Sequence, residues 1–356
     1  MKNYSLFSLL ISIAFLFNSC KKDLSENDLL ARHGIANNST YSWFPDTITG
    51  FGMNSDGKWA MVFNRKKCYF GRLENLMLVP EDSLVFNMLF LNDEYMDWNE
   101  FIYTENNRLI GNWRSSSLIN ITEDTAQLNF FVDSIRNLTL FNDSIWFTGG
   151  NLNMNFVYQY YETNSNLVLT SFRDSISDFS LIIKSFDIDQ NNNFWFLSQY
   201  HNRLYHYLYG DTNRVLVPVY SDTKGYNSLD GFLNPWTRAC IQVDESQQVW
   251  ILFQSKICLY DSKLNSFNYS FHLPYYDPAQ HSFYNLFWDK VNKRMWLIGD
   301  NNSISYFENN KFYTLPVQTL VGSSDLKEGY FKSMTVTKDG TCVFWGRHQL
   351  FVYKPN

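Results

Sequence analysis

Cysteine is scarce in this sequence. Five occur among 356 residues, and none lies in a C-x-x-C pair or in a spacing typical of zinc sites or disulfide frameworks. Cys240 and Cys258 fall on segments that we expect to be the first and third strands of one sheet, roughly 9–10 Å apart. A disulfide cannot bridge that distance. We therefore predict that Cys68, Cys240, Cys258 and Cys342 are free, buried thiols.

Long basic and long apolar runs are also absent. The chain has 29 Lys and Arg against 35 Asp and Glu, a formal net charge of −6, and no basic stripe. This composition disfavours nucleic acid as a partner. After residue 20, no apolar run approaches the roughly 20 residues that a membrane-spanning helix needs. We therefore expect neither a nucleic-acid partner nor a later membrane span.

Catalytic and cofactor motifs are missing as well. The sequence contains no G-x-S-x-G, no phosphate-binding glycine loop and no H-E-x-x-H. The six histidines are scattered, and the one close pair, His201 and His206, would point to opposite faces of an extended strand. We predict no catalytic residue, no metal site and no cofactor.

The first residues carry an export pattern. Lys2 precedes an apolar run from Leu6 to Phe17, which ends at Ser19 and Cys20. About a dozen apolar residues are too few to span a bilayer, but they suit the hydrophobic region of a secretory signal. An ordinary secretory signal with an incidental cysteine is one interpretation of this pattern.

The run Ser-Cys-Lys-Lys-Asp at residues 19–23 resembles the signal of Bacteroidetes lipoproteins. The resemblance implies a signal peptide over residues 1–19 and lipid attachment (palmitate) at Cys20. Residues 20–38 are polar and predict a flexible tether, with the folded domain over residues 39–356. The implied location is the cell envelope, on the periplasmic side or at the surface of the outer membrane, with the lipid as the membrane anchor.

The sequence does contain a recurring motif, which consists of a polar turn, a short strand with Trp, and a strand rich in Tyr and Phe. Its copies are anchored at Trp59, Ile102, Trp146, Trp195, Trp250, Trp296 and Phe344. The intervals of about 43 to 55 residues match four-stranded units. The pattern predicts an all-β fold, a single β-propeller most consistent with seven four-stranded blades; six or eight blades stay open.

Two units show the predicted strands most fully. One has strands at 184–189, 194–199, 203–208 and 214–220, and the next has them at 239–244, 249–254, 257–261 and 268–273. Alternation places Trp250 and Leu252 on the face opposite Val249, Ile251 and Phe253, so both faces are apolar. Because Trp recurs at equivalent places, we expect the anchor residues at 146, 195, 250 and 296 to be buried between blades.

The two ends of the chain complement each other. The last unit stops after a third strand at residues 350–353, while Thr40 to Phe44 is a spare strand before the first unit. Adding the segment at about 40–45 to the last blade would close the ring and cover two sheet edges. We therefore predict closure by the N-terminal strand.

The segments GYNSL (225–229), IQVD (241–244), VWI (249–251) and LYD (259–261) resemble the repeat of two-component-regulator propellers. The first-turn glycine of that repeat is kept at Gly57 and Gly340. In that family such propellers are periplasmic sensor regions. Since we expect neither a later membrane span nor a kinase in this chain, the resemblance implies recognition rather than signalling.

The candidate binding face lies where connections between blades are longest, at 221–238, 274–284 and 316–332. Variable loops on a rigid scaffold commonly bind ligands. Their aromatic and polar residues are the predicted ligand-binding set: Tyr226, Asp230, Trp236, Arg238, Tyr275, Tyr276, Asp277, His281 and Tyr330.

The function expected from this set is non-catalytic recognition of a glycan, a peptide or an envelope protein. A propeller glycosidase or lyase that acts on an extracellular polysaccharide with loop carboxylates is the alternative. A scaffold subunit of an outer-membrane assembly is a third possibility.

Overall fold

The structure is a computed structural model, and it describes most of the strands and their tight turns. The described residues are 38–64, 66–85, 101–113, 117–131, 136–141, 144–151, 154–161, 166–170, 183–198, 204–207, 217–220, 239–253, 256–261, 266–268, 283–299, 302–308, 311–315, 317 and 331–355. The predicted signal peptide, Cys20 and nearly all of the tether lie outside them.

Seven antiparallel four-stranded sheets make up the described chain, and we number them as blades 1 to 7. From the inner strand outwards, blade 1 is β2 (Ile48–Met53), β3 (Lys58–Phe63), β4 (Lys67–Glu74) and β5 (Met77–Val85); blade 2 is β6 (Phe101–Tyr103), β7 (Leu109–Trp113), β8 (Ser117–Ile121) and β9 (Ala126–Phe131); blade 3 is β10 (Arg136–Phe141), β11 (Ser144–Asn151), β12 (Met154–Tyr161) and β13 (Asn166–Thr170).

The later blades follow the same order. Blade 4 is β14 (Ile183–Ile188), β15 (Phe194–Ser198), β16 (Leu204–Tyr207) and β17 (Val217–Tyr220); blade 5 is β18 (Ala239–Val243), β19 (Val249–Phe253), β20 (Lys256–Asp261) and β21 (Ser266–Asn268); blade 6 is β22 (Phe283–Asp289), β23 (Arg294–Gly299), β24 (Ile304–Glu308) and β25 (Lys311–Leu315); blade 7 is β26 (Phe331–Val336), β27 (Cys342–Gly346), β28 (Gln349–Tyr353) and β1 (Ser39–Trp43).

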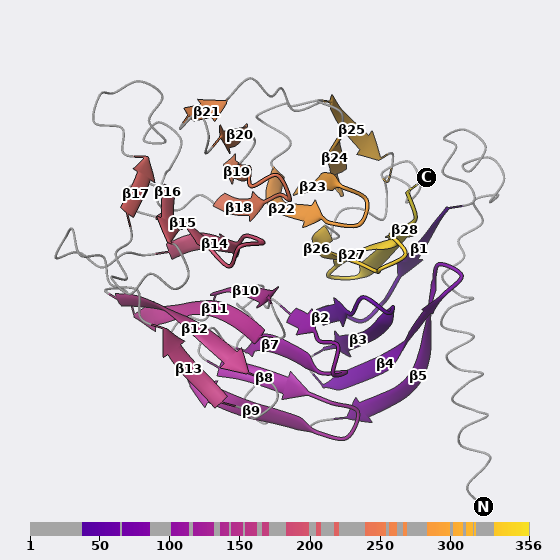
Figure 1. Cartoon of the computed structure of the whole chain (residues 1–356). Helices are drawn as coiled ribbons and strands as arrows, with labels where there is room; N and C mark the ends of the chain where they lie inside the picture. The colour runs from indigo at the N-terminus through magenta and orange to yellow at the C-terminus, as the bar shows by residue number, and fades with distance from the viewer. Residues whose placement is uncertain are drawn as a thin grey trace, which may run out of the picture.

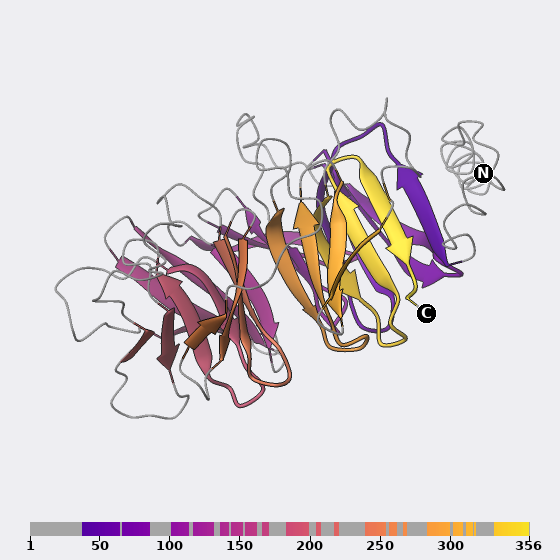
Figure 2. The ribbon, with the colours of Figure 1, turned by 90° about the horizontal axis from the view of Figure 1, so that it is seen from above.

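The blades form a ring, each an open sheet with its first strand at the centre (Figure 1). The first strands of successive blades contact one another all the way round, including β26 of blade 7 with β2 of blade 1. Seen from the side, the strands run between two opposite faces of the ring (Figure 2). The predicted seven-bladed, all-β propeller is therefore confirmed.

The N-terminal strand closes the ring, as predicted. β1 pairs antiparallel with β28 in the register Ser39↔Tyr353 to Trp43↔Gln349, which makes β1 the outer strand of blade 7. Two side-chain bonds add to this pairing. The Tyr41 hydroxyl lies 3.0 Å from Gln349 Oε1, and the Thr40 hydroxyl donates to the backbone oxygen of Leu76 in blade 1. Both termini of the folded domain are thus tied into one sheet.

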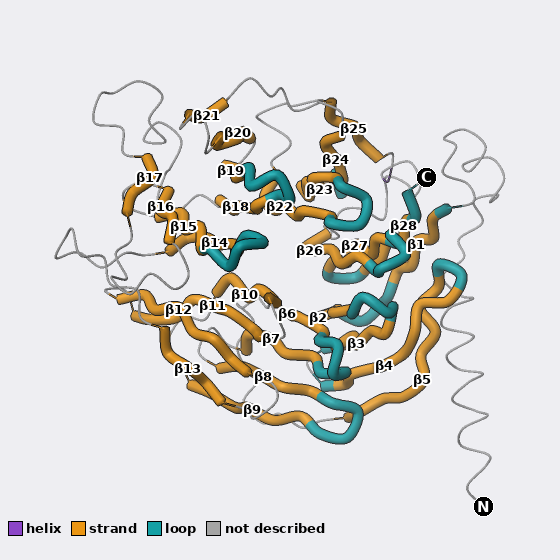
Figure 3. Tube along the Cα trace, in the orientation of Figure 1, coloured by secondary structure: helices purple, strands orange, loops and turns teal. Residues whose placement is uncertain are grey.

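A tight turn joins the first and second strands of the blades, and these turns lie around the middle of the ring (Figure 3). One position in the turn has a left-handed backbone, which costs glycine nothing and asparagine little. It is occupied by Gly57, Asn107, Asn192, Gln247 and Gly340, with φ between 60° and 84°. Asparagine occupies two of the three places that lack glycine, so the turn keeps its left-handed geometry there without it.

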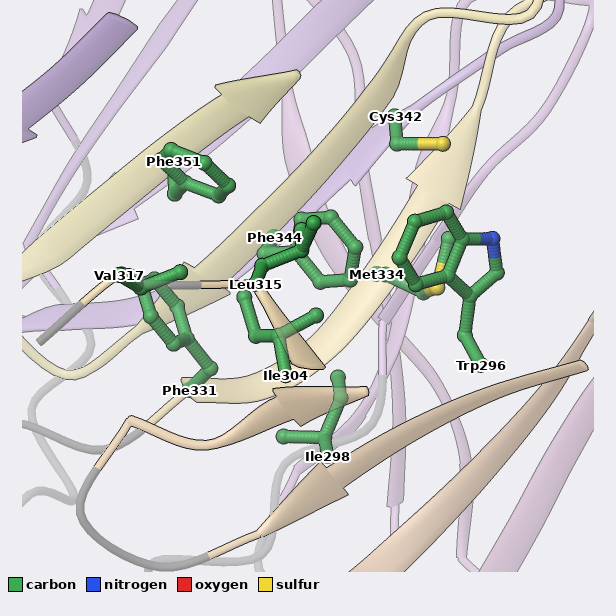
Figure 4. Packing of buried hydrophobic residues seen from close by; sticks show 10 residues of the cluster. All are labelled: Trp296, Ile298, Ile304, Leu315, Val317, Phe331, Met334, Cys342, Phe344 and Phe351. Atoms are coloured by element: carbon green, nitrogen blue, oxygen red, sulfur yellow. The ribbon is translucent and has the colours of Figure 1, made fainter. Parts of the chain in front are cut away.

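Apolar side chains fill the spaces between neighbouring blades. Trp195, Trp250 and Trp296 are 3%, 4% and 0% exposed, and each packs in a cluster shared with the next blade. Figure 4 shows Trp296 beside Phe344 and Met334 of blade 7. The Trp296 and Phe344 rings meet edge to face, with centroids 5.2 Å apart. The predicted burial is confirmed for these three; the side chain at position 146 lies outside the described residues.

One of the predicted anchors is wrong. Ile102 lies in β6, the inner strand of blade 2, rather than in its second strand. Trp59 and Phe344 lie on second strands, as predicted. They face the preceding blade, because Trp59 packs with Val343 and Trp345, and Phe344 packs with Trp296. Ile102 was placed largely by spacing, and a near-constant interval does not determine which of two neighbouring strands a residue occupies.

The outer strand of blade 5 also differs from the prediction. β21 covers Ser266–Asn268 rather than beginning at 268, because it pairs with β20 from Asp261↔Ser266 to Leu259↔Asn268.

The cysteine prediction is confirmed for free thiols at four positions. Cys68, Cys258 and Cys342 are buried, and Cys240 is half-buried.

Candidate binding face

The turns between first and second strands define one face of the ring, which we call the turn face: residues 54–58, 104–108, 189–193, 244–248, 289–294 and 337–341. In three of these turns a buried aspartate starts the turn. Asp244 Oδ1 accepts from the backbone N–H of Ser246 and Gln248 at 2.8 and 3.0 Å, and Oδ2 accepts from Trp250 Nε1 at 2.8 Å. Asp189 and Asp289 bond Trp195 and Trp296 in the same way.

These carboxylates therefore have a structural role. Both oxygens accept hydrogen bonds from the same chain segment, and the side chains of Asp189, Asp244 and Asp289 are 3%, 7% and 1% exposed. Asn54 and Thr337 begin the corresponding turns of blades 1 and 7 and accept turn amides with their side-chain oxygens. The acidic turns that mark the repeat in the sequence thus cap backbone groups.

Neighbouring turns on the turn face are also bonded to each other. Glu105 accepts from the Ser55 N–H of blade 1 at 3.1 Å, and Lys338 of blade 7 pairs with Asp56. Lys293 of blade 6 pairs with Glu245 of blade 5 at 2.9 Å. The Asn292 amide also donates to the backbone oxygen of Gly340 at 2.9 Å. Hydrogen bonds and ion pairs therefore connect neighbouring short turns on the turn face.

The opposite face, which we call the connection face, carries the chain segments that run from one blade to the next. The described segment 44–47 joins β1 to β2 and lies against two turns between second and third strands. Phe44 and Ile48 donate backbone N–H groups to His348 and Arg347 at 2.7 and 2.6 Å, and Asn64 donates to Thr47 at 2.9 Å. This junction confirms that both kinds of loop share one face.

Aromatic and charged side chains lie close together at this junction. The Trp43 and His348 rings stack with centroids 5.3 Å apart and planes 28° apart. Asp46, Lys66 and Arg347 are exposed around them. A stacked aromatic pair among charges of both signs can contact a sugar face or a peptide side chain.

The predicted ligand-binding residues lie outside the described residues. Segments 221–238, 269–282 and 318–330 contain all nine of them, from Tyr226 to Tyr330, and each segment leads from one blade to the inner strand of the next. Topologically they correspond to segment 44–47. Their convergence on one rim stays a prediction.

The inner strands carry a further set of polar residues, which the sequence analysis missed. An inner strand has one edge without a neighbouring strand, so its backbone groups there need other partners. Side chains of the preceding blade supply them. Ser185 Oγ accepts from Ile241 N–H at 3.2 Å and Asp187 Oδ2 accepts from Val243 N–H at 2.7 Å.

Three later junctions repeat this arrangement with neutral groups. Gln242 Oε1 accepts from Trp288 N–H at 3.0 Å, Asn285 Nδ2 donates to the Lys332 oxygen at 2.7 Å, and the Thr335 hydroxyl donates to the Met53 oxygen at 3.0 Å. The last of these joins blade 7 to blade 1. The signal in the sequence is a polar residue at an alternate position of a strand that is otherwise apolar.

The described residues offer little for metal or thiol chemistry. They contain no group of three or more His, Cys, Asp or Glu arranged to hold a metal ion. Burial raises the pKa of Cys240 to about 12 and also raises the pKa values of Cys68 and Cys258, so these thiols stay protonated. No helix in this part of the chain has the length and hydropathy needed to cross a membrane.

Sequence comparison finds no relative. No protein-family model matches the chain, and no curated protein matches it. The described fold, however, is shared with solved structures.

Three solved propellers illustrate the likeness. YCF48 bound to D1 peptide has a TM-score of 0.60 at 12% identity, covering 90% of this chain and 96% of that one. A streptogramin B lyase has a TM-score of 0.60 at 13% identity, covering 90% and 98%. The extracellular domain of the hybrid two-component system BT3049 from B. thetaiotaomicron has a TM-score of 0.59 at 17% identity, covering 89% of this chain and 41% of that one.

This chain thus spans less than half of the two-component-system domain. At these identities the likeness shows the fold. The structure shows a seven-bladed β-propeller, and the comparisons show that solved extracellular domains of two-component systems share its fold.

Proposed function

We propose that this protein is a non-catalytic recognition protein of the cell envelope, which binds a peptide, protein or glycan partner through its connection face. The observation that carries the proposal is the difference between the two faces. Turns on the turn face are short and bonded to one another, and their carboxylates cap backbone groups. The opposite end of the strands receives the long, dissimilar connections between blades.

Two further points support a macromolecular partner. The described junction of the connection face presents the Trp43–His348 stack among exposed charges. A solved propeller of this fold has a bound peptide, which shows that such a scaffold can serve this purpose in another protein. The lipid anchor at Cys20 is part of the proposal and holds the recognition domain at a membrane.

Binding of the purified full chain to peptide and glycan arrays tests this function. We expect the double variant Trp236→Ala, Tyr276→Ala to lose the array signal while its melting temperature stays within about 2 °C of the wild type, since surface changes seldom exceed 0.5 kcal/mol. The matched control is Met77→Ala with Val291→Ala. These residues are 58% and 46% exposed at the turn-face end of the strands. Loss of signal in the control, or its retention in the first variant, would contradict the proposal.

A propeller enzyme is the second candidate, because a lyase shares this fold. Among the described residues, Asp187 is the carboxyl whose pKa rises to about 6, and burial is the cause. Both of its oxygens accept backbone N–H groups, which leaves it unsuited to act on a substrate. Incubation with acidic and neutral polysaccharides, followed by product chromatography, checks this candidate: new reducing ends or unsaturated products would establish catalysis.

A further inference from the structure

The exposed cations on the two faces of the ring differ in how they are paired. On the turn face, lysines form ion pairs with carboxylates of the turns, and these pairs are Lys293 with Glu245, Lys338 with Asp56, and Lys354 with Asp339. On the connection face, the side chains of Lys66 and Arg347 are exposed, and among the described residues neither has an ion pair or a hydrogen bond. The junction of blades 7 and 1 therefore presents two unpaired cations in a chain whose formal net charge is −6.

The fold brings these two cations to the same place. Arg347 lies in the turn between β27 and β28, Lys66 lies in the turn between β3 and β4, and the chain that joins β1 to β2 runs between the two turns. Ile48 N–H donates to the Arg347 oxygen at 2.6 Å, and Asn64 N–H donates to the Thr47 oxygen at 2.9 Å. The backbones of the two turns are therefore about two strand spacings apart, roughly 10 Å. The long side chains of Arg347 and Lys66 can contact one ligand across that distance.

The other charged groups of the junction have partners of their own. Asp46 Oδ1 accepts from the side-chain amide of Asn64 at 2.8 Å. Lys67 Nζ lies over the Tyr69 ring, 4.3 Å from its centroid. Three cations against one carboxylate leave the described junction with an excess of positive charge. Such an excess favours an anionic ligand.

Half-buried aromatic rings lie beside the cations. Besides the stacked pair of Trp43 and His348, the Phe44 and Phe63 rings have centroids 5.4 Å apart, and the Phe63 and Tyr69 rings meet edge to face at 5.6 Å. Ring faces suit the flat apolar side of a sugar. An acidic peptide carries its carboxylates on flexible side chains and has no such ring next to them. Rings beside unpaired cations therefore fit a sugar that carries a carboxylate.

We infer that the junction of blades 7 and 1 on the connection face is a subsite for acidic sugars, in which Arg347 and Lys66 bind the carboxylate and the Trp43–His348 stack contacts the sugar ring. The guanidinium of Arg347 presents a planar fork of N–H donors that matches the two oxygens of a carboxylate, and Lys66 adds a compact positive charge. The inference rests on the proposed function, and it narrows the ligand from glycans in general to glycans that contain uronic acids.

Binding of the purified full chain to polygalacturonate, alginate and hyaluronan, three polymers that contain uronic acids, tests the subsite by affinity gel electrophoresis. We expect at least one of them to retard the protein, and the retardation to weaken as salt is added, because exposed charge pairs are screened. The methyl ester of a polymer that binds keeps the sugar ring and loses the charge. It should bind about 10-fold more weakly.

The double variant Arg347→Gln, Lys66→Gln supplies the second arm. It should lose about 10-fold in affinity for the acidic polymer. Its melting temperature should not change, because neither side chain has a partner among the described residues. The matched control is Lys293→Gln with Lys338→Gln, which removes the same charge from the turn face and should bind as the wild type does. An equal loss in the control would show that net charge alone drives binding, and would overturn the subsite.

Two results with the wild type would also overturn the subsite, and neither needs a variant. One is the failure of all three polymers to retard the protein. The other is binding of poly-L-glutamate as tight as that of the acidic polymers, which would assign the surface to an acidic peptide. If the subsite alone fails, array binding that depends on Trp236 and Tyr276 persists, whereas the absence of all array binding refutes the proposed function as well.

Discussion

Replacement of Asp244 by alanine tests the turn that recurs in blades 4, 5 and 6. The change removes three acceptor bonds at once, to the N–H groups of Ser246, Gln248 and Trp250. The two backbone N–H groups of the turn can form hydrogen bonds to water instead. Their contribution to the loss of stability is therefore comparable to that of a helix cap, about 1–2 kcal/mol. The indole N–H stays buried, because Trp250 is 4% exposed, and leaving it without a partner costs about 1–3 kcal/mol.

We therefore expect Asp244→Ala to lower the free energy of unfolding by about 2–5 kcal/mol. Blade 1 supplies the control. Asn54 accepts its turn amides in the same way, but Trp59 Nε1 has no hydrogen-bond partner. Asn54→Ala should therefore lose only the turn contribution, about 1–2 kcal/mol.

Urea unfolding of the full chain, followed by far-UV circular dichroism, measures both variants. The intermediate substitution Asp244→Asn should fall between the two, because it keeps one oxygen for the turn amides. The reasoning is refuted if Asp244→Ala lies within about 0.5 kcal/mol of the wild type, or if it is no more destabilising than Asn54→Ala.

Three further predictions concern closure, core packing and the anchor. Deleting Thr40 to Pro45 removes β1 and exposes the edge of β28, so light scattering should show aggregation; a monomer with unchanged melting contradicts this. Trp296→Ala empties a site that is 0% exposed and should cost about 3–5 kcal/mol in the same urea assay; a loss below about 1 kcal/mol contradicts burial between blades. Radiolabelled palmitate should enter the wild type and not Cys20→Ala, and equal labelling of both refutes lipid attachment.

Much of the fold could be predicted because the residues that form the repeated motif are close together in the sequence. In blades 4, 5 and 6 an aspartate precedes Trp by a short interval, and the hydrogen bond between them fixes both the turn and the face of the Trp. Where Thr104 replaces the aspartate, that marker is absent and interval counting placed the anchor at Ile102, on the wrong strand. In blade 2, therefore, no local marker identified the second strand.

The hydrogen bonds between blades could not be predicted in the same way, because they join residues that are far apart in the sequence. Asp187 and Val243 are 56 positions apart in the sequence and meet only because β14 and β18 stand side by side. A strand that packs between two apolar neighbours is expected to be apolar on both faces. β14 departs from this at Ser185 and Asp187, while Phe186 and Ile188 between and after them obey it.

Such a departure can be found from sequence once the strand's position is known. Conflicts between local pattern and fold concentrate at functional or strained places. The neutral residues Gln242, Asn285 and Thr335 show that the conflict at Ser185 has an ordinary structural explanation, which is the unpaired edge of an inner strand. Asp187 extends the same explanation, because its two oxygens accept one N–H within its own strand, from Ile188, and one from Val243 of the next blade.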